Sequence, residues 1–160
     1  MFGNGPTVVD KTPMIVLTQP GDEEDNAARP LAGPGGVLLT RFLGDAGIDI
    51  ESIYVTNAVK CRSHEKDIDN LPKNALKACS EYLETELEEI RPPVILALGN
   101  LAYKFFAHKS GIKIGRGQTL LFKKLGWQGV VIPTYDPRYI LKYPALYPAL
   151  EADIGKFGRI

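Results

Sequence analysis

Short apolar runs alternate along the chain with longer stretches in which apolar residues recur every three or four positions. Four continuous runs predict buried strands, at residues 14–18, 52–56, 94–98 and 130–133, and residues 120–123 suggest a short extra one. The longer stretches predict helices over residues 35–46, 73–90, 100–107 and 144–157. This alternation predicts an α/β fold, namely a three-layer α/β/α sandwich with a central four-stranded, mostly parallel sheet.

Two of the predicted helices have a clear apolar stripe. In residues 35–46 the stripe consists of Val37, Leu38, Phe42 and Leu43, and in residues 73–90 it consists of Leu76, Cys79, Leu83, Leu87 and Ile90. The second helix must end before the two prolines that follow Arg91, because a residue that precedes proline avoids the helical conformation.

The chain has 160 residues, enough for one domain with a proper core, and we predict a single domain over residues 1–160. No apolar run is long enough to cross a bilayer and no signal-peptide pattern opens the sequence, so we expect a cytoplasmic protein with no membrane partner. The two cysteines, Cys61 and Cys79, imply no disulfide framework.

The net charge is zero, but the charges are unevenly distributed. Residues 100–143 carry eight lysines and arginines and a single acid, Asp136. Such a surface suits a phosphate backbone, because Lys and Arg contacts supply the sequence-independent part of nucleic-acid affinity. A basic helix face and loops without a ligand are the alternative.

Sites of open parallel sheets lie at the carboxyl ends of the strands. This rule selects the loops at residues 18–36, 56–64, 99–100 and 134–138. The first of these loops opens with a Pro-Gly turn and four consecutive acids. It is the candidate for an active-site loop, for a binding loop without chemistry, or for a solvated turn.

Six segments, in order, resemble motifs of the uracil-DNA glycosylase superfamily, most closely its family 4 and phage polymerase-associated members. TQPGDEED (18–25) is similar to GEAPGxxED, and ARPLAGPGG (28–36) is similar to GRPFVGxAG. The other four are YVTNAVKCR (54–62), VILALGNLAYKFF (94–106), GRGQ (115–118) and PTYDPRYIL (133–141), the last in the place of PTxHPSxLL. The resemblance implies a protein that flips a damaged base out of DNA, binds its edge in a pocket and hydrolyses the N-glycosidic bond.

The resemblance assigns base binding to four positions. Asn57 stands where the family reads the uracil edge, and its amide offers a donor and an acceptor together. An asparagine that caps its own turn is the alternative. Leu31 replaces a phenylalanine that stacks on the flipped base, while Pro20 and Gly21 retain the family's loop.

The positions expected to carry the chemistry differ from the family pattern. Thr18 replaces a glutamate, and a hydroxyl does not act as a general base near neutral pH. Gln19 replaces the usual alanine, and its amide can hydrogen-bond a base or a sugar. Asp136 replaces a histidine that donates to the leaving base, which an aspartate can do only when protonated. Alternatively, Asp136 takes over the activation of water.

The resemblance also places DNA contacts and a loop support. Arg116, Arg138 and Lys142 are candidate phosphate contacts. Tyr135, beside them, is a candidate for wedging or stacking, with core packing as its alternative. Glu24 and Asp25 match the family's ED pair and either support the first loop or are simply solvated.

Family 4 enzymes hold a [4Fe–4S] cluster with four cysteines, and Cys61 and Cys79 fall on two of those positions. The other pair belongs to an N-terminal segment that the sequence does not contain. We therefore expect no cofactor and no metal site, with a cluster shared between two chains as the alternative.

Three functional hypotheses follow. The first is a DNA-binding, glycosylase-like protein whose pocket accepts a flipped base and whose excision of uracil or another modified base is weak or altered. The second is a catalytically silent DNA-binding or replication-associated subunit, encoded by a phage and located in the host cytoplasm. The third is a protein-interaction module on the same fold. The expected partners are single-stranded or damaged duplex DNA and, for the second hypothesis, a replication protein.

Overall fold

The structure, a computed structural model, describes residues 3–18, 22–27, 31–59, 73–109, 111–124 and 126–159. In these residues one sheet contains five strands: β1 (Met14–Leu17), β2 (Tyr54–Asn57), β3 (Val94–Leu98), β4 (Leu120–Lys124) and β5 (Trp127–Thr134). Their order is β2-β1-β3-β5-β4. The first four in this order run parallel, and β4 pairs antiparallel with β5 at the edge.

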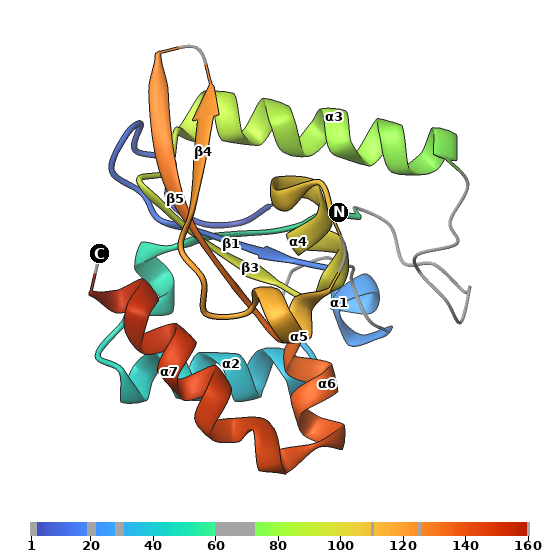
Figure 1. Cartoon of the computed structure of the whole chain (residues 1–160), viewed down its shortest axis with the longest axis vertical. Helices are drawn as coiled ribbons and strands as arrows, with labels where there is room; N and C mark the ends of the chain where they lie inside the picture. The colour runs from blue at the N-terminus through green and yellow to red at the C-terminus, as the bar shows by residue number, and fades with distance from the viewer. Residues whose placement is uncertain are drawn as a thin grey trace.

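The predicted α/β class and mostly parallel sheet are confirmed, but the sheet has five strands in the described residues and not four. The fifth is β4, the short strand that the sequence only suggested. It forms a hairpin with β5 that projects beyond the other strands in Figure 1. Because β4 pairs on one side only, its Leu121 is 58% exposed, and its apolar pattern is weaker than that of a central strand.

Helices cover both faces of the sheet (Figure 1). One face carries α3 (Lys73–Ile90) and α4 (Asn100–Ala107), and the other carries α2 (Pro34–Asp45), α6 (Pro137–Lys142) and α7 (Tyr147–Gly158). The short elements are α1 (Asp22–Ala27), α5 (Ile112–Gly115) and the 3-10 turns η1 (Ile50–Ser52) and η3 (Pro144–Leu146). No helix in the described ranges is long and apolar enough to cross a membrane.

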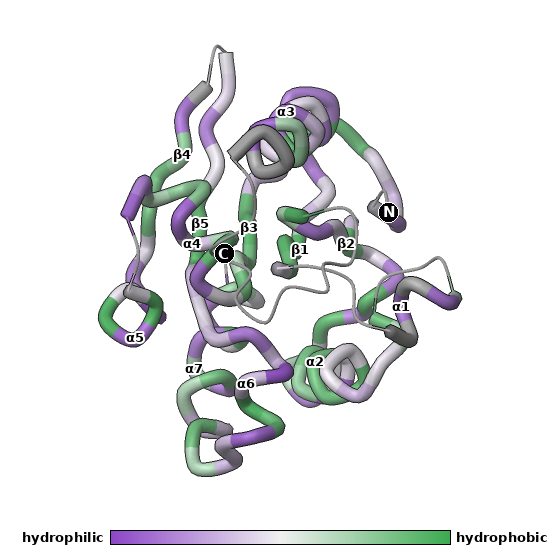
Figure 2. The backbone as a smooth tube through the Cα atoms, turned by 90° about the vertical axis from the view of Figure 1, so that its right-hand side faces the viewer, coloured by the Kyte–Doolittle hydropathy of each residue, from purple (hydrophilic) through white to green (hydrophobic). Residues whose placement is uncertain are grey.

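The strands β1 and β3 are apolar throughout because both of their faces are covered. Ile15 and Leu96 pack in the cluster beneath α2 and α7, while Val16 and Ile95 pack in the cluster beneath α3 and α4. Figure 2 shows the apolar strands β1, β2 and β3 lying between α2 and α3. Burial on both faces is the physical reason that these strands appear in the sequence as continuous apolar runs.

The helix predictions need two corrections. In α2 the buried side chains are Leu38, Leu39 and Leu43, whereas Val37, predicted on the stripe, is 64% exposed. The stripe therefore follows the spacing from Leu39 to Leu43. The predicted helix over residues 144–157 is divided into η3 and α7, because Pro148 is tolerated only in the first turn of a helix. The α3 stripe is confirmed at Leu83, Leu87 and Ile90, whereas the side chain of Leu76 lies outside the description.

Two buried acids connect the sheet to its helices. The Glu86 carboxylate of α3 accepts hydrogen bonds from the Tyr54 hydroxyl (2.6 Å) and the Thr56 hydroxyl (3.0 Å). Burial and the neighbouring Glu86 raise the pKa of Tyr54 well above its usual value. On the other face, Asp153 of α7 is fully buried and accepts a hydrogen bond from the Thr134 hydroxyl at the end of β5 (2.6 Å).

Asp153 also binds Arg116, through two hydrogen bonds of 2.7 Å and 3.0 Å. The hydrogen bond to Asp153 raises the pKa of Arg116, so the guanidinium stays charged. This pair fixes the GRGQ segment against α7 and β5. Lys156 of α7 also donates to the carbonyl of Gly117 in the same segment.

We predict that Asp153→Ala lowers the free energy of unfolding by about 3 kcal/mol, because it leaves Arg116 and Thr134 without their shared acceptor. Urea denaturation followed by circular dichroism measures this change. The matched control is Glu151→Ala on the exposed side of the same helix, for which we expect a change within about 0.5 kcal/mol. Equal effects of the two substitutions would contradict the role given to Asp153.

Candidate functional site

The carboxyl ends of β1, β3 and β5 meet at Gly99. This residue has a φ of 91°, and its amide donates to the Thr134 carbonyl at the end of β5 (2.9 Å). A methyl group at Gly99 would lie 2.6 Å from Thr18 Oγ1 and 3.3 Å from Asp136 Cβ. Only glycine combines this backbone conformation with such close neighbours. Gly99 therefore allows the predicted site residues Thr18 and Asp136 to converge.

Thr18 has a structural role that its sequence position did not indicate. It is buried, and its hydroxyl donates to the Leu98 carbonyl at the end of β3 (3.0 Å). The carbonyl of Thr18 accepts a hydrogen bond from the amide of Val59, in the segment after β2 (2.9 Å). The residue thus joins three strand ends. Its predicted place among the catalytic residues receives no support from this geometry, because its hydroxyl proton is used in a contact with the backbone.

Asp136 begins α6 as its N-cap. Its carboxylate accepts a hydrogen bond from the Arg138 amide (2.8 Å), and both its oxygens face the Arg138 guanidinium, at 3.2 Å and 3.4 Å. Pro137 occupies the first turn, so the order Asp-Pro-Arg is a helix-start signal that was readable in the sequence. With both oxygens accepting, Asp136 presents an acceptor where the family pattern has a donor.

A small cavity, the Asn57 pocket, lies between β1, β2 and the N-termini of α2 and α6. Its wall contains Leu17, Glu24, Leu31, Gly35, Gly36, Asn57, Asp136, Pro137 and Arg138. Asn57 is 1% exposed and pairs with Leu17 across the two strands. The structure thus brings together the predicted base-binding residues Asn57 and Leu31 with Asp136 and Arg138.

The Asn57 pocket has a volume of about 20 Å³, which accommodates roughly one water molecule. Two glycines let its walls approach so closely. A methyl group at Gly36 would lie 2.4 Å from the Cα of Leu31, and one at Gly35 would lie 3.0 Å from Arg138 Cγ. A nucleobase enters only if a wall moves. Arg138, whose side chain is 41% exposed, is the wall residue that can leave into solvent.

A larger cavity lies on the other side of Thr18 and Asp136. It measures about 460 Å³, and we call it the α4–α6 cavity because it is bounded by the N-terminus of α4, by α5 and by the start of α6. Thr18 lines this cavity and not the Asn57 pocket, whereas Asp136 lines both. Sequence reasoning missed its α5 wall, because four residues are too few to show a helical period.

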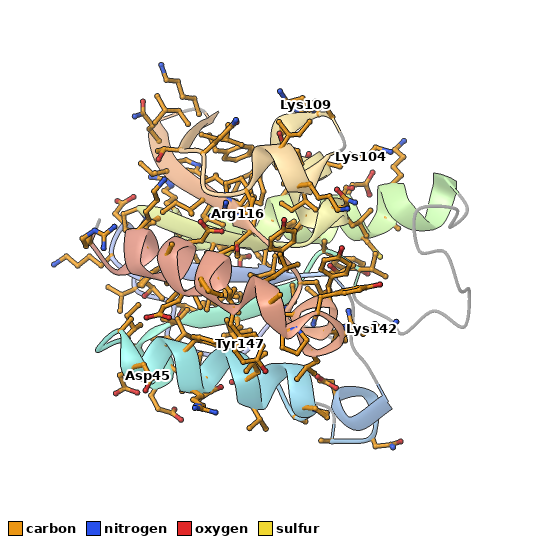
Figure 3. The ribbon with its side chains drawn as sticks, turned by 60° about the horizontal axis from the view of Figure 1, so that its bottom comes forward. Asp45, Lys104, Lys109, Arg116, Lys142 and Tyr147 are labelled. Carbon is orange, nitrogen blue, oxygen red and sulfur yellow. The ribbon has the colours of Figure 1, made fainter. Side chains whose placement is uncertain are left out.

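The predicted DNA contacts occupy different environments. Arg138 and the exposed Lys142 lie on α6, at the same edge of the sheet as the Asn57 pocket. Arg116 is instead held by Asp153 beside α7, whereas Lys104 and Lys109 extend from the α4 region (Figure 3). Tyr135 is buried and stacks on Tyr139, with ring centroids 5.6 Å apart, which agrees with its core-packing alternative.

The remaining predicted site residues are only partly described. Glu24 on α1 is half-buried and lines the Asn57 pocket, which agrees with a loop-support role. The side chain of Asp25 lies outside the description, as do Gln19, Pro20 and Gly21. Their predicted roles stay predictions.

The donor set of the sequence does not fit a four-cysteine iron–sulfur cluster. Cys61 lies outside the described residues, and Cys79 has a half-buried thiol. Among the described residues, no group of three or more His, Cys, Asp and Glu side chains is arranged to hold a metal ion. The two cysteines of the sequence supply at most two of four thiolates, so no chemical step is assigned to a cluster.

Comparison with known proteins finds uracil-DNA glycosylases and a phage DNA polymerase with similar sequences. The sequence model of the uracil DNA glycosylase superfamily matches residues 3–154. The type-4 uracil-DNA glycosylase of Saccharolobus solfataricus is 34% identical over 150 residues, which cover 89% of this chain and 68% of that protein. The type-4 uracil-DNA glycosylase of Thermotoga maritima is 38% identical over 136 residues, or 84% of this chain and 68% of that protein. A DNA polymerase of Bacillus phage SP01 is 32% identical over 133 residues, which cover 82% of this chain and 14% of the polymerase.

We predict that Gly99→Ala destabilises the protein more than Gly47→Ala does. Both glycines have positive φ, of 91° and 77°, but nothing lies within 4 Å of a methyl group at Gly47. Gly47→Ala therefore measures the cost of a positive φ without a collision, about 1–2 kcal/mol. Gly99→Ala adds the collision with Thr18, and its φ of 91° with ψ of 171° is a conformation essentially restricted to glycine. Urea unfolding of the two variants measures the difference, and equal losses would contradict the constraint assigned to Gly99.

Proposed function

Because the chain belongs to the uracil-DNA glycosylase superfamily, we propose that it binds DNA, admits a flipped base to the Asn57 pocket and excises uracil or another modified base only weakly. The observation that carries this proposal is the Asp136–Arg138 ion pair at the mouth of that pocket. It puts a carboxylate, held as an acceptor, where the superfamily pattern has a histidine that donates to the leaving base.

Weak excision follows from the charge that develops during the reaction. As the glycosidic bond breaks, negative charge collects on the base, and hydrogen-bond donors aimed at it lower the barrier. Asp136 accepts at both oxygens and repels that charge, while the Thr18 hydroxyl is bound to Leu98 and supplies no general base. Loss of one such donor costs about 100- to 1,000-fold in rate, so we expect excision slower than that of a typical superfamily member by at least this factor.

DNA binding and opening of the Asn57 pocket are linked through Arg138 in this proposal. A phosphate competes with Asp136 for the guanidinium, because Arg forms paired hydrogen bonds with either group. When Arg138 turns to a phosphate, it leaves the pocket wall and the mouth opens toward the base. Lys142, exposed at the end of the same helix, adds a second phosphate contact.

A second candidate function is a catalytically silent, replication-associated subunit. The similarity to part of a phage DNA polymerase favours it, since the matched region covers 14% of that polymerase and 82% of this chain. In this case DNA is bound and a base is admitted, but no bond is broken. The two candidates share every structural feature of the Asn57 pocket and differ in the excision rate alone.

We predict that Thr18→Glu combined with Asp136→His raises uracil excision at least about tenfold, because it restores a general base and a donor. Excision is measured by alkaline cleavage of labelled single- and double-stranded oligonucleotides that contain uracil or 5-hydroxymethyluracil. Adding Asn57→Ala should abolish the gain. Cleavage by the unaltered protein as fast as by the double variant would contradict the proposed attenuation, and binding without any cleavage would favour the silent subunit.

We predict that Arg138→Ala combined with Lys142→Ala weakens binding to single-stranded DNA and reduces the slope of log affinity against log salt by about 1.4, or 0.7 for each lost contact. Fluorescence anisotropy at several salt concentrations measures both quantities. The matched control removes two exposed cations of the α4 region, by Lys104→Ala and Lys109→Ala, and should leave the slope nearly unchanged. DNA binding that is absent, or independent of salt, would instead favour a protein-interaction module.

A further inference from the structure

The α4–α6 cavity has the size of a small-molecule site, whereas the Asn57 pocket does not. Its volume is about 460 Å³, against about 20 Å³ for the pocket. The two hollows are neighbours on either side of Asp136, which lines both. Consecutive residues of β1 and its loop face them separately, Leu17 toward the pocket and Thr18 toward the cavity. A ligand in the α4–α6 cavity would therefore lie directly beside a base in the Asn57 pocket.

The walls of the cavity suit the flat face of a nucleobase. Tyr139 lines it, stacks on Tyr135 with ring centroids 5.6 Å apart, and meets Tyr143 at a tilt of 47° with centroids 4.8 Å apart. Ile112 and Ile114 also line the cavity, and Ile114 has 84% of its surface exposed. Aromatic side chains bind the bases of single-stranded nucleic acid with little regard to base identity, and the exposed isoleucine adds apolar surface.

The charges of the cavity suit the backbone that such a base carries. Lys113 is exposed, lines the cavity and stands between Ile112 and Ile114 in the sequence. Asp136, the acid that also lines the cavity, is engaged by Arg138. The cation at the rim therefore matches a phosphate, while the interior matches an uncharged ring.

We propose that the α4–α6 cavity binds the nucleotide that neighbours the flipped one on the same DNA strand. The base packs against Ile114 and Tyr139 in this cavity, and its phosphate contacts Lys113. This inference rests on the proposed function, because it requires that the strand deliver a base to the Asn57 pocket. It adds a second recognition site, which requires that a neighbouring base be present but does not depend on which base it is.

The test uses fluorescence anisotropy with single-stranded oligonucleotides that carry one uracil. In two further oligonucleotides an abasic analogue replaces the nucleotide immediately 5′ or immediately 3′ of the uracil. We expect one of these replacements to weaken binding to the unaltered protein about tenfold, because one stacked base is lost. Ile114→Ala should weaken binding of the intact strand by several-fold, and Lys113→Gln should reduce the salt slope by about 0.7.

Combining a variant with the abasic strand identifies the contact. If the missing base stacks on Ile114, the abasic replacement should have a smaller effect in Ile114→Ala than in the unaltered protein. Tyr139→Ala should behave in the same way, and Ile114→Ala keeps the test valid if Tyr139→Ala unfolds the domain. The control is Leu121→Ala, an exposed aliphatic residue of β4, which should keep the full effect of the abasic replacement.

The outcomes separate this inference from the proposed function. If neither abasic replacement changes affinity, or if both change it equally in every variant, the subsite is overturned while DNA binding stands. If the unaltered protein binds none of the oligonucleotides at low salt, the proposed function fails and the subsite fails with it. A tenfold loss on one side only, suppressed by Ile114→Ala and kept by Leu121→Ala, supports the subsite.

Discussion

The close approach of three strand ends at Gly99 is the constraint on which the site depends. The Thr18 hydroxyl reaches the Leu98 carbonyl, and the Asp136 side chain lies beside Gly99, only because this position carries no side chain and adopts a positive φ. The same contact divides the carboxyl edge of the sheet into two hollows of different size. One constraint of the backbone thus sets the positions of both the Asn57 pocket and the α4–α6 cavity.

Thr18 and Asp136, the two positions at this constraint that differ from the superfamily pattern, both make stabilising contacts with the backbone. Thr18 satisfies a backbone carbonyl at the end of β3, and Asp136 caps α6, a role that contributes about 1 kcal/mol at an N-cap. A glutamate and a histidine at these positions would give up both contacts. Residues selected for catalysis are often poor for stability, and here the stable choice is present at each position. In the proposed function, Thr18 and Asp136 therefore contribute to the stability of the strand ends and not to the activation of water or of the leaving base.

Much of the fold was predictable because its signals are local. Strands buried on both faces appear as continuous apolar runs, and the eighteen residues of α3 are long enough to show a helical period. Motif spacing predicted a shared site for Asn57 and Leu31, and the two residues do line one pocket. The ion pair of Arg116 with Asp153 was not predictable, because it joins residues 37 positions apart and depends on how α7 packs. The capping role of Asp136 was readable in Asp-Pro-Arg, but the resemblance directed attention to its chemistry instead.

Not all of the positive charge in residues 100–143 is free to bind phosphate, because its two arginines are paired with aspartates. Arg116 is paired with Asp153 and Arg138 with Asp136, so within residues 100–143 the remaining positive charge is carried by lysines. In the proposed function, Arg138 becomes available only when its pair with Asp136 breaks, and breaking that pair opens the Asn57 pocket. By linkage, whatever favours the proposed phosphate contact then favours the open pocket, and a base bound in the pocket strengthens the phosphate contact by the same factor. The proposal thus makes the residue that closes the pocket the one through which DNA opens it.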